Sequence, residues 1–124
     1  MNWIFTDDRP IYLQIVEQLE LGILAREFPP GSQVPSVRDL ALEAEVNPNT
    51  MQKALAILED KKLMHTERTS GRFVTEDKTM IDNLKKNLAA GHLKQFMDSV
   101  QKLGLTKKEI IEMIEKNMKE EKSE

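Results

Sequence analysis

The sequence predicts a mainly α-helical fold with one small β-hairpin (α+β), and three observations carry this prediction. Apolar residues recur at helical spacing over five stretches of the 124-residue chain. Two short strand-like segments flank Thr69-Ser70-Gly71, a tripeptide suited to a tight turn. The length accommodates one core-bearing domain plus an appendage, because single domains commonly run to about 100–150 residues.

The first expected element is an amphipathic helix from Pro10 to about Glu27. Proline suits the first helical turn, where its missing N–H costs nothing. The stretch from Phe28 to Ser32 contains two prolines and a glycine and breaks the helix. The apolar face comprises Ile11, Ile15, Val16, Leu19, Ile23 and Leu24.

Two short helices joined by a tight turn follow. Ser36 is expected to cap the first, with Asp39 completing a pair like a capping box, and that helix should end near Glu45. Asn47 caps the second, with Pro48 in its first turn. The second helix turns Met51, Ala54, Leu55 and Leu58 inward, so its opposite face presents Asn49, Thr50, Gln52, Lys53 and Ala56.

The remaining elements are a hairpin and two more helices. Residues 63–68 and 72–75 form the hairpin strands. A longer helix runs from about Thr79 to Leu103 and stops at Gly104. A capping box from Thr106 to Glu109 opens the last helix, whose charged end from Lys119 onward is expected to fray.

Composition excludes several classes of function. With no cysteine and only His65 and His92, we expect no metal and no cofactor. No apolar run could cross a membrane and the N-terminus does not look like a secretion signal, so we expect a cytoplasmic protein. No nucleophile–base pair or glycine-rich phosphate loop can be assembled, which argues against an enzyme. A net charge of −3 means that any nucleic-acid binding must depend on a few well-placed groups.

The order helix, turn, helix, hairpin is that of a winged helix-turn-helix, whose second paired helix enters the DNA major groove. Gln52 can pair with adenine, and Lys53 can meet a phosphate or guanine. Ser36 and Arg38 lie in a first helical turn, where free N–H groups favour phosphate. The candidate DNA-binding residues are Ser36, Arg38, Asn49, Thr50, Gln52, Lys53, Arg68, Ser70, Gly71 and Arg72.

Three segments closely resemble the GntR family of bacterial regulators: residues 35–41, 46–55 and 71–74. The stretch from Pro10 to Ile15 and the short helical tail are similar to its YtrA subfamily. The resemblance implies a dimeric, usually repressing, operator-binding protein, often linked to transporter operons. It also implies DNA contacts at Arg38, Asn49, Thr50, Gln52, Lys53 and the wing around Gly71.

Two positions depart from the family pattern. Glu45 and Thr69 stand where the family often has glycine. If Glu45 takes a left-handed conformation, the cost relative to glycine is about 1 kcal/mol, which surrounding packing can absorb.

We expect residues 1–75 to form the DNA-binding domain and residues 76–124 to form a helical dimerisation region. The long helix carries more apolar surface than one small winged domain can cover, and palindromic DNA sites are read by two-fold symmetric proteins. The expected homodimer interface comprises Ile81, Leu84, Leu88, Phe96, Val100, Leu103, Ile110 and Ile114.

Three alternatives remain open at this point. The tail could fold back on its own subunit instead of dimerising. The winged helix could bind another protein without specific DNA binding, which the acidic balance favours. His92, Phe96 and Met97 could line a small apolar effector pocket between subunits, although a core or interface role is the preferred interpretation.

Overall fold

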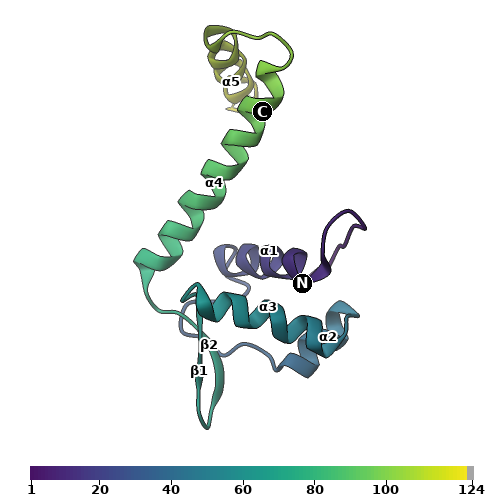
Figure 1. Cartoon of the computed structure of the whole chain (residues 1–124). Helices are drawn as coiled ribbons and strands as arrows, with labels where there is room; N and C mark the ends of the chain where they lie inside the picture. The colour runs from purple at the N-terminus through teal and green to yellow at the C-terminus, as the bar shows by residue number, and fades with distance from the viewer. Residues whose placement is uncertain (123–124) are drawn as a thin grey trace. The chain divides into compact units, whose positions relative to one another are not determined.

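The computed structural model describes residues 1–122 and is shown in Figure 1. The chain divides into two compact units, Met1–Lys85 and Lys86–Glu124. None of the helices within residues 1–122 is both long enough and apolar enough to span a bilayer. The elements are α1 (Ile11–Leu24), α2 (Val37–Ala44), α3 (Pro48–Asp60), β1 (Met64–Glu67), β2 (Gly71–Val74), α4 (Lys78–Gln101) and α5 (Lys107–Lys122). The predicted fold class, mainly α with one small hairpin, is confirmed.

The core of the first unit lies among α1, α2, α3 and the hairpin. Helix α3 is central, because it packs against α1, α2 and β1. The predicted inward face of α3 is confirmed, since none of its four apolar residues has any exposed surface. The largest fully buried side chains are Ile15, Leu19, Ile23, Leu40, Met51, Leu55, Leu58, Met64 and Val74.

Helix α1 ends at Leu24 and not near Glu27 as predicted. Arg26 adopts a left-handed conformation with φ of 62°. The backbone N–H groups of Glu27 and Phe28 then return to the carbonyl of Gly22, at 2.9 and 3.3 Å. The Phe28 ring lies so close to Gly22 that an added Cβ there would be 2.9 Å from it. These backbone hydrogen bonds end the helix without changing the spacing of its apolar residues. The end predicted from that spacing was therefore too late.

The predicted caps of α2 and α3 are present. The Ser36 hydroxyl oxygen accepts a hydrogen bond from the Asp39 N–H at 3.1 Å, and Asn47 Oδ1 accepts one from the Asn49 N–H at 2.7 Å. Glu45, which ends α2, does take the left-handed conformation, with φ of 58° and ψ of 46°. The tight turn between the two helices thus contains a left-handed glutamate, at a position where glycine would adopt the same backbone conformation without strain.

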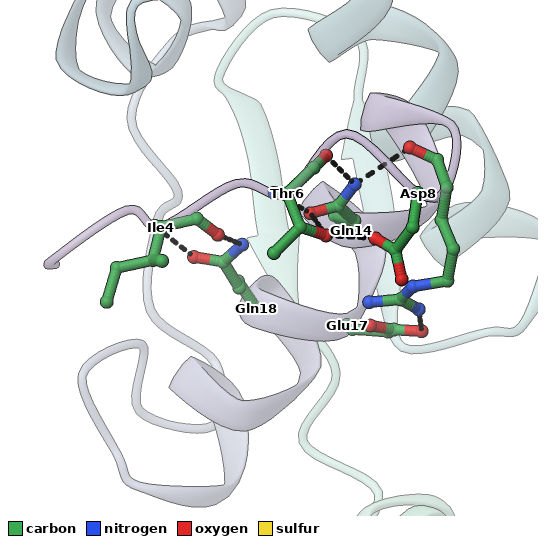
Figure 2. A network of polar contacts seen from close by, with 7 residues as sticks. Ile4, Thr6, Asp8, Gln14, Glu17 and Gln18 are labelled. Atoms are coloured by element: carbon green, nitrogen blue, oxygen red, sulfur yellow. Dashed lines mark hydrogen bonds and ion pairs between the residues drawn. The ribbon is translucent and has the colours of Figure 1, made fainter.

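The segment before α1 lies along that helix, a feature that the sequence analysis did not predict (Figure 2). The Gln14 amide accepts a hydrogen bond from the Thr6 N–H at 2.8 Å and donates one to the Thr6 carbonyl at 2.9 Å. Gln18 does the same with Ile4, at 3.1 and 2.8 Å. The spacings match, because residues four apart in a helix rise about 6 Å and alternate residues of an extended chain are about 6.6 Å apart. The side-chain amides of these two glutamines thus supply the hydrogen bonds that a neighbouring strand would otherwise make.

In the second unit, α4 and α5 are joined by a turn in which Gly104 has φ of 82°. The predicted capping box is reciprocal: the Glu109 N–H donates to Thr106 Oγ1 at 3.2 Å, and the Thr106 N–H donates to Glu109 Oε1 at 3.1 Å. Helix α5 extends to Lys122, so the charged end from Lys119, which was expected to fray, is helical over the residues described, and positions 123–124 lie outside them. Glutamates placed four residues before lysines in this helix support its last turns.

Candidate nucleic-acid interface

The outer face of α3 consists of polar side chains on a firmly held helix. Asn49, Gln52 and Lys53 are exposed and Thr50 is half-buried, whereas the opposite face is fully buried in the core. The first turn is capped by Asn47. Because the inner face cannot rotate without breaking the core, the outer side chains are presented in one fixed direction.

Lys53 contacts a residue that the sequence analysis did not single out as part of the site. Its Nζ lies 3.8 Å from the centre of the Tyr12 ring, on α1. A cation over an aromatic face is held by about 0.5–1 kcal/mol at an exposed site. Tyr12 therefore steers the lysine side chain. The only sequence signal for it was its place in the stretch from Pro10 to Ile15.

The N-terminus of α2 presents Ser36 and Arg38. The Ser36 hydroxyl already accepts the Asp39 N–H, and its own proton stays available to donate. Arg38 is exposed, and its guanidinium makes no hydrogen bond or ion pair with any residue in 1–122. The partial positive charge of the helix end and a free guanidinium together favour an anion such as a phosphate.

The wing is the β1–β2 hairpin, in which Met64 pairs with Val74 and Glu67 with Gly71. Gly71 has φ of 112°, and an added Cβ would lie 2.9 Å from the Gln33 amide nitrogen. That amide donates a hydrogen bond to the Ser70 carbonyl at 2.6 Å. The backbone conformation at position 71 thus favours glycine, and the Gln33 amide lies against it.

Arg72 is tied into the protein, unlike the exposed Arg68 and Ser70. Its Nε donates to Glu59 Oε1, on α3, at 3.1 Å, and the Thr66 hydroxyl donates to the same oxygen. Burial acts to raise the pKa of Glu59, but the hydrogen bonds from Thr66 and Arg72 outweigh it and hold the pKa below its ordinary value. One carboxylate thereby connects the recognition helix to both strands of the wing.

The α2 N-terminus and the wing line one shallow groove of about 220 Å³. It brings Ser36 next to Gly71 and Arg72, which lie far from it in the sequence. The backbone N–H of Val34 donates to the Arg72 carbonyl at 2.8 Å, which fixes the two sides of the groove to each other. The lining residues are Gln33, Val34, Pro35, Ser36, Thr66, Gly71 and Arg72.

The residues predicted for the dimer interface divide into two groups. Leu84, Val100 and Ile110 are buried within the single chain, and Ile81 and Leu88 are half-buried. Phe96, Leu103 and Ile114 are exposed, as are four apolar residues that the sequence analysis did not assign to an interface: Leu93, Ile111, Met113 and Met118. The apolar residues of α5 form one broad face, of which only Ile110 is buried, so periodicity could not tell which part of that face packs internally.

Comparison with known proteins gives consistent matches over nearly the whole chain. The family model described as bacterial regulatory proteins, gntR family, matches residues 11–74. The uncharacterised HTH-type transcriptional regulator YhcF of Bacillus subtilis is 38% identical over 89% of this chain and 91% of its own length. The HTH-type transcriptional repressor YtrA of the same organism is 34% identical over 85% of this chain and 82% of its own length.

A solved structure agrees with these relatives. A GntR family transcriptional regulator from Listeria monocytogenes superposes with a TM-score of 0.84 at 38% identity, covering 90% of this chain and 98% of that one. The predicted winged helix-turn-helix, the resemblance to the YtrA subfamily and the expectation of a regulator instead of an enzyme are confirmed. The chain belongs to the GntR family of bacterial regulatory proteins and is a transcription regulator with a DNA-binding helix-turn-helix.

Proposed function

We propose that this regulator binds a palindromic operator as a homodimer and represses transcription. The observation that carries the proposal is the outer face of α3, where Asn49, Gln52 and Lys53 are exposed on a helix whose inner face is fully buried. A helix held in this way fits the major groove, and amide and ammonium groups match the base edges found there.

The flanking groups suit the DNA backbone. Ser36 and Arg38 at the α2 N-terminus would contact phosphates, and Arg68 and Ser70 at the wing tip would contact phosphates or a narrow minor groove. Arg72 would have a mainly structural role, because its Nε is held by Glu59 at 3.1 Å. With a net charge of −3, the chain offers few phosphate contacts, so we expect weak non-specific affinity and a strong dependence on base contacts.

The second unit supports the dimer part of the proposal. Of the eleven exposed large apolar side chains among residues 1–122, seven belong to Lys86–Glu124, which is under a third of the sequence. Such a concentration of apolar surface favours association with a second copy. A two-fold symmetric dimer would then present two α3 helices to the two halves of a palindrome.

The repressor role and the regulated genes rest on likeness. The relative YtrA is named a transcriptional repressor. The family resemblance supports control of a transporter operon, and a regulator of this kind would reside in the cytoplasm with the chromosome. A reporter fused to the promoter of the candidate operon tests the repressor role and the choice of target. Deleting the gene for this regulator should raise expression of the reporter, and a fall would instead indicate an activator.

The operator itself is tested by selecting binding sites from random duplexes and titrating the enriched duplex by fluorescence anisotropy. We expect a preference of about a thousandfold over a scrambled duplex, with affinity that falls as salt rises. Gln52→Ala should cost about tenfold at one base position, and Arg38→Ala should weaken all sequences alike. Lys116→Ala, on α5, is the matched control and should bind like the wild type. Undiminished binding by both site variants would favour a protein-interaction module.

A further inference from the structure

A second concave site of about 800 Å³ lies within the unit Met1–Lys85, and none of the predicted DNA contacts lines it. It is formed by the C-terminal end of α1, the loop that follows and the first turns of α4. Its volume falls in the usual range for small-molecule sites, about 300–1,000 Å³. The lining residues are Ile23, Leu24, Arg26, Pro29, Pro30, Lys78, Ile81, Asp82 and Lys85.

The lining combines an apolar wall with an excess of positive charge. The half-buried Leu24 and Ile81 contribute aliphatic surface beside the two prolines, with the buried Ile23 behind them. Three cations and one carboxylate line the same site, whereas the whole chain carries a net charge of −3. We propose that this site binds an amphipathic anion, a small molecule with an apolar body and a carboxylate or phosphate group.

The backbone at Arg26 gives an independent reason to assign a role to this site. Arg26 holds φ of 62° at the position just after α1, where glycine is the usual residue because it adopts this conformation at lower cost. Of the three left-handed residues that end helices of this unit, Arg26, Glu45 and Lys62, only Arg26 lines the cavity. Strained residues of this kind cluster at ligand sites.

The location suggests what the ligand would do, a consequence that rests on the proposed function. Ile81 and Lys85 belong to α4, which continues from this unit into the second one. An anion bound by Arg26 and Lys85 would therefore contact the start of α4, the helix that joins the DNA-binding unit to the unit with the exposed apolar side chains. By linkage, the factor by which the bound ligand changes operator affinity equals the factor by which the bound operator changes ligand affinity.

The test is an ¹⁵N NMR titration of the full chain, without DNA, using 4-phenylbutyrate and its neutral counterpart 4-phenylbutan-1-ol. We expect saturable binding of the acid, about tenfold tighter than the alcohol, with shifts confined to residues 22–31 and 77–86. A parallel titration with 4-phenylbutyl phosphate distinguishes a preference for carboxylate from one for phosphate. Equal affinity for acid and alcohol, or shifts only beyond residue 86, would overturn the proposal.

Matched double variants separate ligand binding from folding. Arg26→Gly with Lys78→Gln removes two cations of the site and should weaken the acid about tenfold. Lys62→Gly with Lys116→Gln is the matched control, because it also removes one cationic residue with a left-handed backbone and one lysine of a helix. Both residues lie outside the site, so the affinity for the acid should be unchanged. Both doubles relieve a left-handed residue, so a loss of binding cannot be ascribed to a poorer backbone.

Equal losses in the two double variants would refute the assignment. If the operator titration succeeds while neither anionic probe binds saturably, the effector site is wrong and the proposed function stands. If the probes bind at the site while no operator is found, the site stands and the proposed function fails.

Discussion

At the scale of single residues, three helices of the first unit end on a left-handed residue that is not glycine. These residues are Arg26 after α1, Glu45 after α2 and Lys62 after α3. Each accepts a backbone conformation that costs about 1 kcal/mol relative to glycine. Arg26 lines the proposed anion site, whereas Glu45 forms no part of any cavity or predicted contact described above.

Glu45→Gly should therefore stabilise the protein. We expect the free energy of unfolding to rise by about 0.5–1 kcal/mol, since the relief of strain exceeds the greater freedom of glycine in the unfolded chain. Urea denaturation followed by circular dichroism measures it. The control, Gln52→Gly in the middle of α3, should lower stability by about 1 kcal/mol. A fall in stability with Glu45→Gly would show that the carboxylate makes a compensating interaction.

Glu59 is the second residue whose effect can be measured directly, through pH. Its pKa is held below the ordinary value by the hydrogen bonds from Thr66 and Arg72, which exceed the opposing effect of burial. The stabilisation is therefore fully present above the pKa of the unfolded state and is lost as pH falls through the lower folded-state pKa. Between about pH 7 and pH 3.5, wild type should lose more stability than Glu59→Gln. Identical pH profiles of stability for the two proteins would contradict the stabilising role assigned to the Glu59 carboxylate.

At the scale of elements, the N-terminal segment is held mainly by α1, with its amino group bonded to Glu43 on α2 at 3.1 Å. Gln14 is 2% exposed, and its amide nitrogen also donates to the Arg9 carbonyl at 2.8 Å. Trp3 and Phe5 stack with ring centres 6.1 Å apart. The segment has no partner strand among the described residues, so the amides of α1 supply its hydrogen bonds (Figure 2).

Gln14→Glu should release this segment, because a carboxylate cannot donate to the carbonyls of Thr6 and Arg9. We expect a cost of about 1–3 kcal/mol for the buried groups left unpaired. Fluorescence of Trp3, the single tryptophan of the chain, should shift to the red before the main unfolding transition. Leu13→Gln, a change at an exposed position of the same helix, should leave the emission as it is. An unshifted spectrum in Gln14→Glu would contradict the role assigned to this amide.

At the scale of the whole molecule, the two units differ in how completely they bury their apolar side chains. The first has a closed core in which nine large side chains have less than 2% of their surface exposed. Among residues 86–122, Val100 and Ile110 are buried, while Leu103 is 77% exposed and Met118 61%. A unit with this surface is expected to gain its stability from a second copy.

Leu103→Glu combined with Ile114→Glu should therefore dissociate the proposed dimer. We expect the dissociation constant to rise at least about a hundredfold, since two apolar contacts worth more than about 1.4 kcal/mol each would be lost. Sedimentation velocity measures it, and operator affinity should fall in parallel because the half-sites are no longer bound together. Gln95→Glu adds a charge at an exposed polar position of α4 and should remain dimeric. A wild-type protein that stays monomeric at micromolar concentration would refute the dimer.

By itself the sequence determined the element order, the caps of α2, α3 and α5, and the buried face of α3. These features depend on residues close together in the chain, where periodicity and capping chemistry act locally. Only the tertiary structure decided that Arg72 is held by Glu59, that Tyr12 steers Lys53, that Gln14 and Gln18 bind the N-terminal segment, and that Arg26 lines a cavity. Each of these depends on how separate segments of the chain pack or fold back against one another, which no local pattern records.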